Sequence, residues 1–153
     1  MDLLKDKYII VEIIPTSSKA NTGFIAQISA LKIDGLKLID RFDYRVADNL
    51  LKNNDIKKLI SYDNNMFNYV NNTYFIKEKF KSWSNNYPLL LIEDTYTIDF
   101  LKDLDNSKEL VYKYLNMEYT LDIFDRIIKK YNLVPSNHLV DLIYEALIYE
   151  TNT

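Results

Sequence analysis

A near-continuous run of β-branched residues lies close to the N-terminus and constrains the fold more than any other feature. It spans Tyr8–Ile14 and reads YIIVEII, and Pro15 ends it. A short apolar run without polar alternation is typical of a strand that is covered on both faces, and proline cannot continue a central strand. We therefore expect Tyr8–Ile14 to be an inner strand, with other elements packed on each side of its sheet.

Two further strands follow this run, and they form a hairpin. The stretches Phe24–Ile33 and Leu36–Val46 are rich in isoleucine, leucine and aromatic residues. Between them lies Asp34-Gly35, a dipeptide that favours the tight turn of an antiparallel hairpin. The polar residues 16–22 connect the first strand to the second. The chain thus begins with a three-stranded antiparallel meander.

Helical and strand patterns alternate after the meander, which indicates a layered fold with a mixed sheet. The asparagine-rich stretch Ser61–Asn72 should be a loop. We take residues 1–153 as a single α/β domain, in which three antiparallel strands and then shorter strands form a mixed sheet flanked by helices. The expected helices are Asn49–Ile60, Thr73–Trp83, Thr97–Leu104, Thr120–Tyr131 and Asn137–Tyr149, and the expected short strands are Pro88–Ile92 and Glu109–Tyr112.

The composition excludes several kinds of site. The chain has no cysteine, which excludes disulfides, thiolate metal sites and cysteine nucleophiles, and His138 is its single histidine. The net charge of −3 argues against strong non-specific binding to nucleic acid, because such binding depends on lysine and arginine contacts with phosphate. The charged N-terminus lacks the apolar centre of a signal peptide, and no apolar run approaches the roughly 20 residues that span a bilayer. We expect a cytoplasmic protein without a membrane segment.

The first half of the chain contains four segments whose order matches a known family. Val11–Ser17 is similar to a hydrophobic strand that ends in the family's D-x-E-T-T-G, and Ile25–Gly35 is similar to its I-x-E-I-G-A followed by a strand and D-G. Ile39–Phe42 continues the match, and Ile56–Met66 is similar to I-x-x-L-T-G-I-T-x-x-M. On these segments the chain resembles the DnaQ-like (DEDDh) 3′–5′ exonucleases of the ribonuclease-H-like superfamily.

Two later segments extend the resemblance over nearly the whole chain. Pro88–Leu101 lies where the family has a strand followed by A-H-N-x-x-F-D-x-x-F-L, and Asn137-His138 lies where it has H-x-x-x-x-D. The resemblance implies a ribonuclease-H-like fold. In the family it also implies hydrolysis of phosphodiester bonds with two divalent metal ions, which four carboxylates hold while a histidine activates the attacking water.

Most of this chemistry is missing at the five matching positions. Glu12 keeps a carboxylate, whereas Ile14 and Ile143 are apolar and Thr97 is neutral; only His138 is unchanged. Hard divalent cations such as Mg²⁺ need several oxygen ligands in a strict geometry. The loss of three of the four carboxylates therefore implies a catalytically degenerate member of the family.

Other acidic residues nearby in the sequence could form a metal site at a new position, and this alternative stays open. Asp141 follows His138 by three residues, so both could lie on one side of the final helix. The commoner interpretation is structural, with His138 at a helix start and Glu12 solvated or paired with a lysine. The metal-ligand candidates are Glu12, Asp94 and Asp141, with Glu93 and Asp99 near them in the sequence.

A second candidate site is a surface for a binding partner. Ile60 and Ser61 replace the T-G with which the family contacts its substrate. The segment Tyr62–Phe75 combines aromatic residues, among them Phe67 and Tyr69, with many asparagines and almost no charge. Such a composition can stack on bases or anchor a protein partner, although a loop packed on its own domain is commoner.

Two classes of function therefore remain open. The first is a catalytically inactive module that acts in DNA or RNA metabolism by binding a protein partner, a second copy of itself or, more weakly, nucleic acid. No cofactor is expected for it. The second is a divergent 3′–5′ exonuclease that acts on DNA or RNA with Mg²⁺ or Mn²⁺. The missing carboxylates favour the first class.

Overall fold

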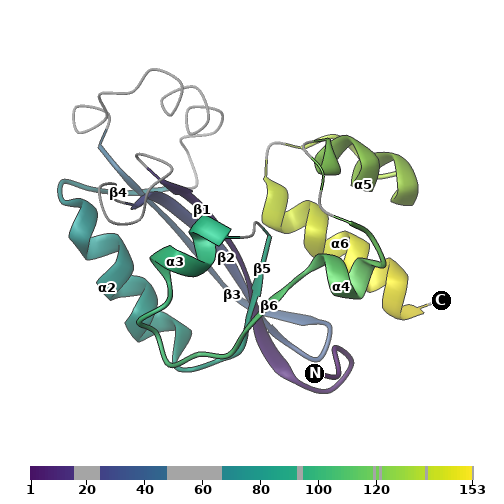
Figure 1. Ribbon diagram of the computed structural model, residues 1–153, viewed down its shortest axis with the longest axis horizontal. Coiled ribbons are helices and arrows are strands. Elements are labelled where there is room, and N and C mark those ends of the chain that lie inside the picture. The colour runs from purple at the N-terminus through teal and green to yellow at the C-terminus, as the bar shows by residue number, and fades with distance from the viewer. Residues whose placement is uncertain are drawn as a thin grey trace.

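A six-stranded mixed sheet forms the centre of the molecule (Figure 1). The computed structural model describes residues 1–15, 25–47, 67–92, 95–118, 120, 122–136 and 138–152, so the helix expected over Asn49–Ile60 lies outside the described residues. The strand order is β4-β3-β2-β1-β5-β6. The strands are β1 (Lys7–Pro15), β2 (Ile25–Asp34), β3 (Lys37–Val46), β4 (Asn68–Val70), β5 (Leu89–Leu91) and β6 (Lys108–Leu110).

The predicted meander forms the antiparallel half of this sheet. β1 pairs with β2 and β2 pairs with β3 in antiparallel register. The three short strands join in parallel, β4 beside β3, β5 beside β1 and β6 beside β5. The predicted α/β fold with a mixed sheet is therefore confirmed, and β1 lies inside the sheet with a partner strand on each edge.

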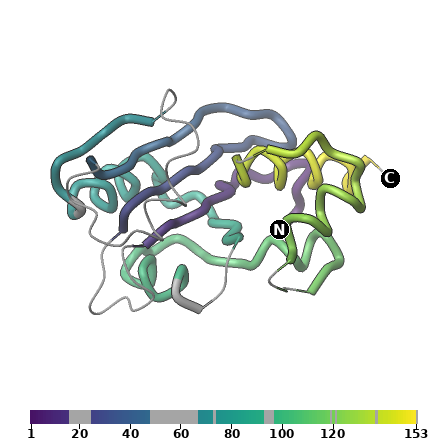
Figure 2. Tube along the Cα trace, turned by 90° about the horizontal axis from the view of Figure 1, so that it is seen from above, coloured from purple at the N-terminus to yellow at the C-terminus, as the bar shows by residue number. Residues whose placement is uncertain are grey.

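Helices cover both faces of the sheet (Figure 1). α2 and α3 pack on one face, and α4, α5 and α6 pack on the other. Seen from above, α5 and α6 lie side by side near the C-terminus and away from α2 (Figure 2). The helices are α2 (Thr73–Ser84), α3 (Thr95–Phe100), α4 (Tyr112–Leu115), α5 (Ile123–Tyr131) and α6 (Leu139–Asn152).

β1 separates two hydrophobic cores because successive side chains of a strand point to opposite faces. Ile9, Val11 and Ile13 pack with α2 and α3, whereas Tyr8 and Ile10 pack with α4, α5 and α6. All five side chains are at most 1% exposed. This alternation explains why the N-terminal run has no polar face, as the sequence predicts.

Two elements differ from the sequence prediction. β4 lies in the stretch expected to be a loop; its three residues are too few to show alternation, and it forms through pairing with Tyr44–Val46 of β3. The strand expected over Glu109–Tyr112 ends at Leu110, and α4 follows at once. Tyr112 and Leu115 are buried against the second core, and this packing favours a helical turn over a longer strand.

The turn between β2 and β3 requires glycine at position 35. Gly35 has φ +52°, and a Cβ atom there would lie only 2.6 Å from the carbonyl oxygen of Leu4. Its N–H donates to the carbonyl oxygen of Asp6 at 2.9 Å. The hairpin predicted from Asp34-Gly35 therefore also holds the N-terminal segment in place.

Candidate functional site

The matching positions of the exonuclease motifs lie on β1, α3 and α6. β1 and β5 run in parallel, with Val11 beside Leu91, and the N–H of Ile92 donates to the carbonyl oxygen of Val11 at 3.3 Å. The carboxyl end of β5 therefore lies beside the middle of β1, next to Glu12, and α3 begins a few residues after β5. The carboxyl ends of parallel strands are the usual location of ligand sites in α/β sheets.

Glu12 is the carboxylate that remains, and it is largely buried. Its side chain is 8% exposed, and strand alternation puts it on the same face of β1 as Ile10, toward α6. In the register of the sheet it lies beside Ser29 of β2. Ile14, the second matching position, is half-buried and packs against the core under α2. The strand end therefore presents one carboxylate toward α6 and an apolar side chain toward α2.

Thr97 lies in α3 and is almost completely buried, at 1% exposure. Within the described part of the chain, its hydroxyl oxygen has no hydrogen-bond partner. A buried hydroxyl without a partner costs free energy. At this position the resembled family has a carboxylate, and Thr97 offers a single neutral oxygen instead.

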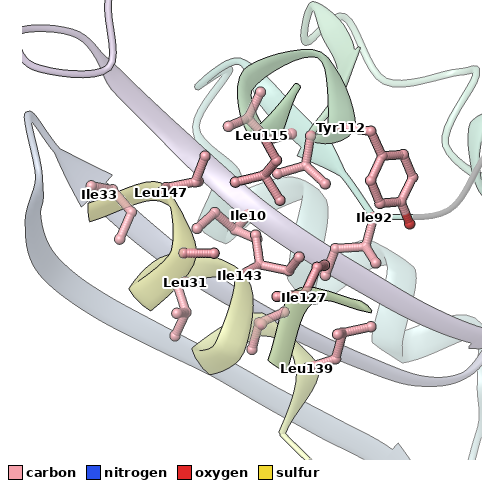
Figure 3. Packing of buried hydrophobic residues seen from close by; sticks show 14 of the residues in the cluster. Ile10, Leu31, Ile33, Ile92, Tyr112, Leu115, Ile127, Leu139, Ile143 and Leu147 are labelled. Atoms are coloured by element: carbon pink, nitrogen blue, oxygen red, sulfur yellow. The ribbon is translucent and has the colours of Figure 1, made fainter. Parts of the chain in front are cut away.

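Ile143 is completely buried at the centre of the second core. Figure 3 shows its side chain among those of Ile10, Leu31, Leu139 and Leu147. These neighbours come from β1, β2 and α6, so the fourth matching position faces an apolar environment. A carboxylate at this point would lose its hydration without gaining a partner from these neighbours.

His138 directly precedes α6 and is half-buried. Its backbone N–H donates to Ser136 Oγ at 3.0 Å, and its carbonyl oxygen accepts from the N–H groups of Asp141 and Leu142 at 3.1 and 3.2 Å. His138 thus forms part of the start of the helix, as expected if its role is structural. A catalytic role for its imidazole stays a prediction.

Asp141, a proposed metal ligand, is held by an arginine. Arg41 of β3 donates from Nη1 to Oδ1 at 2.7 Å and from Nη2 to Oδ2 at 3.1 Å. Asp99 is exposed on α3, and Asp94 and Glu93 lie outside the described residues. Across the described ranges, no three histidine or acidic side chains are grouped closely enough to hold a metal ion. The residues present there do not fit a pair of divalent ions.

A row of buried polar side chains, which we did not predict from the sequence, crosses the sheet beside Glu12. Glu12 of β1, Ser29 of β2 and Asp43 of β3 are neighbours in the strand registers and are at most 8% exposed. Gln27 and Arg45, each 1% exposed, form the next row. The alternating polar residues of β2 and β3 were the available signal, because period-2 polarity places them on one face.

Arg41 and Asp43 set the electrostatics at the edge of this row. Arg41 Nε donates to Asp43 Oδ2 at 3.2 Å. Burial raises the pKa of Asp43, and the nearby Arg41 charge only partly opposes this effect. Hydrogen bonding to Asp141 raises the pKa of Arg41. The guanidinium therefore compensates two carboxylates, one buried and one half-buried.

The segment proposed as a partner surface divides between interior and surface. Phe67 is only 6% exposed and lies in the interior directly before β4, which fits the alternative of a segment packed on its own domain and not a partner surface. Tyr69 is 46% exposed, Tyr74 64% and Phe75 53%, so these three side chains remain available to a partner. The candidates Ile60, Ser61 and Tyr62 lie outside the described residues.

One further expectation concerns membranes. Of the helices that the structure describes, none is long and apolar enough to cross a bilayer.

Comparison with solved structures identifies the fold: it is that of exonuclease I, which agrees with the fold expected from the resemblance to the DnaQ-like exonucleases. Several solved structures of exonuclease I are similar to this chain. A product-bound form is 13% identical, with a TM-score of 0.58 over 97% of this chain and 43% of that one. The E. coli enzyme with a dT13 oligonucleotide is 12% identical, with a TM-score of 0.56 over 96% and 41%.

A third similar structure is the ExoI/SSB-Ct complex, 11% identical, with a TM-score of 0.57 over 95% of this chain and 40% of that one. The chain thus spans about two fifths of the length of the exonuclease I chains. At these identities the likeness establishes the fold alone. The sequence matches no family model, and no curated protein matches it.

Proposed function

We propose that this protein is a catalytically inactive exonuclease-fold module that acts by binding a partner in DNA or RNA metabolism. The observation that carries the proposal is the packing of Ile143. In the exonuclease family that the chain resembles, the two-metal site would need a carboxylate at position 143 of α6. Ile143 instead contributes to the apolar core with Ile10 and Leu31, so the helix packs on the sheet through hydrophobic contacts.

The neighbouring charges support the same conclusion. Glu12 is the remaining carboxylate of the matching set, and Thr97 offers one neutral oxygen. Asp141 is bound by the Arg41 guanidinium, whose positive charge opposes the approach of a metal cation. A single carboxylate with one hydroxyl falls short of the ligands that Mg²⁺ requires.

Two kinds of partner fit the proposal. Exonuclease I has been crystallised with an oligonucleotide and in the ExoI/SSB-Ct complex, so both a protein and a single strand are reasonable partners for this fold. Tyr69, Tyr74 and Phe75 offer exposed rings that can stack on bases or anchor a protein. The net charge of −3 favours a protein partner.

The alternative is a divergent exonuclease that depends on Mg²⁺ or Mn²⁺, and the retained Glu12 is the observation that favours it. A degradation time course separates the two functions. It uses 3′-labelled and 5′-labelled single-stranded DNA and RNA with Mn²⁺, and compares the wild type with Glu12→Ala. We expect no shortening of any strand. Cleavage that Glu12→Ala abolishes would establish the enzyme and overturn the proposal.

A second experiment, in which a positive result is expected, restores the missing carboxylates. We expect the combined variant Ile14→Glu, Thr97→Asp and Ile143→Asp to bind Mn²⁺ in titration calorimetry, because the resemblance of the sequence motifs assigns these three positions to the family's metal ligands. The matched control carries Gln, Asn and Asn at the same positions, which keep the shapes without the charges. Equal Mn²⁺ binding by the wild type would show that the site is already functional.

A further inference from the structure

Three charged side chains connect the start of α6 to the sheet. Arg41 of β3 uses the forked end of its guanidinium for Asp141, at 2.7 and 3.1 Å, and its Nε for Asp43, at 3.2 Å. Asp43 lies two residues further along the same strand face, and Asp141 is in the first turn of α6. Three N–H donors of one guanidinium thus link two carboxylates from different elements.

The two carboxylates have different surroundings. The Asp43 side chain is 7% exposed, whereas those of Arg41 and Asp141 are 32% and 35% exposed. An exposed ion pair contributes little by itself, because water screens it and both side chains lose rotamer freedom. A guanidinium that is already fixed by a buried carboxylate loses less freedom when it binds a second carboxylate. Asp43 is therefore the partner that can pre-orient Arg41.

We propose that Arg41, Asp43 and Asp141 form a charge latch, in which Asp43 orients Arg41 and Arg41 fixes the first turn of α6 on β3. The latch also positions His138, because the Asp141 N–H donates to the His138 carbonyl oxygen at 3.1 Å. Asp43 is a positioning residue that is linked to Asp141 through hydrogen bonds to Arg41. The latch is independent of the proposed function, because it concerns the placement of α6 and not the chemistry at β1.

The remainder of α6 is held by other contacts. Ile143 and Leu147 pack in the second core, and the Tyr144 hydroxyl donates to the carbonyl oxygen of Leu36 at 2.6 Å. Tyr144 thus anchors the following turn to the β2–β3 hairpin through a hydrogen bond that involves none of the three latch side chains. Loss of the latch should release the first turn of α6 while the later turns stay packed.

The single histidine makes this release measurable. His138 contributes the one set of imidazole resonances in the NMR spectrum, so its signals need no assignment by mutation. We expect Arg41→Lys, which keeps the charge but loses the fork, to shift these resonances. We also expect it to speed amide exchange at Leu142 by about tenfold or more, the range for a lost hydrogen bond to a charged group. Amides of α2 serve as the internal reference.

Asp43 provides the decisive test. Asp43→Leu, or Asp43→Asn if the leucine variant does not fold, should move the His138 resonances in the same direction as Arg41→Lys. It should also reduce the coupling between Arg41 and Asp141 in a double-mutant cycle. Tyr144→Phe is the matched control and should leave the first turn unchanged. Unchanged coupling in the Asp43 variant, or an equal effect of Tyr144→Phe, would overturn the latch.

Discussion

At the scale of single residues, the face of β3 on which a side chain lies decides its environment. Asp40 lies toward α2, where its carboxylate accepts a hydrogen bond from Trp83 Nε1 at 2.9 Å. Asp43 lies toward α6 and is buried. The hydrogen bond from Trp83 lowers the pKa of Asp40, whereas burial raises the pKa of Asp43. The pKa values of two aspartates on one strand are thus shifted in opposite directions, so their charges affect stability differently as the pH changes.

This difference predicts that the effect of Asp40→Asn on the free energy of unfolding depends on pH. Because the pKa of Asp40 is lowered in the folded state, its charge stabilises the fold above the ordinary value of 3.8. That contribution disappears as the pH falls through the lower, folded-state pKa. Urea unfolding between about pH 7 and pH 2.5 should show the wild type losing its advantage over the variant at the acidic end. A difference that is independent of pH would contradict the assignment.

Ile143 gives a second prediction at the residue scale. We expect Ile143→Asp to lower the free energy of unfolding by more than about 3 kcal/mol, because it buries an unpaired carboxylate in the core. Ile143→Val is the control and should cost about 1 kcal/mol, since it removes one methylene group. Chemical denaturation at neutral pH measures both. Equal losses in the two variants would mean that the site can hydrate or pair a carboxylate.

At the scale of elements, asparagine ends three helices in the left-handed conformation. The residues after α2, α4 and α5 are Asn85, Asn116 and Asn132, with φ of 48°, 51° and 54°. Asparagine tolerates this conformation better than other residues with a Cβ atom. After α5, the Leu133 N–H also donates to the Ile128 carbonyl oxygen at 2.9 Å, which satisfies a carbonyl group of the last turn.

Substitutions at Asn132 test this role. We expect Asn132→Ala to lower the free energy of unfolding by about 1 kcal/mol, because alanine is strained at positive φ. Asn132→Gly should stay within about 0.5 kcal/mol of the wild type, since glycine adopts this conformation freely. Thermal or urea unfolding measures both variants. If the alanine and glycine variants had equal free energies of unfolding, the positive φ at position 132 would not be what stabilises the end of α5.

The helices and strands also show which elements could be predicted from sequence patterns. Two local signals predicted elements correctly: the run Tyr8–Ile14 predicted β1, and the turn at Asp34-Gly35 predicted the hairpin of β2 and β3. β4 and α4 were missed, since β4 exists through pairing with β3 and α4 through burial of Tyr112 and Leu115. Neither cause is visible in a short stretch of sequence.

At the scale of the whole molecule, the sheet carries two cores, and α6 closes the second core through apolar packing and the Arg41 pair. A ligand raises the melting temperature when it binds the folded state alone. A metal site with a Kd of about 50 µM would add about 2.7 kcal/mol at about 5 mM metal, which corresponds to several degrees for a chain of this length.

We therefore expect Mg²⁺ and Mn²⁺ at about 5 mM to leave the melting temperature unchanged relative to EDTA. Differential scanning fluorimetry measures it, with Ca²⁺ as the control for general ionic effects. The combined carboxylate variant described above should gain stability with Mn²⁺ in the same assay. A rise of several degrees for the wild type would show a metal site that the described residues do not reveal.

The sequence by itself determined the central strand, the meander, the α/β class and the absence of carboxylates at three positions that resemble exonuclease motifs, because these depend on local patterns and residue identity. Tertiary structure decided that Glu12, Ser29 and Asp43 form one buried row, and that Arg41 binds Asp141 across 100 positions of the chain. Strand register and helix docking bring such residues together, and both arise from packing between elements that lie far apart in the sequence.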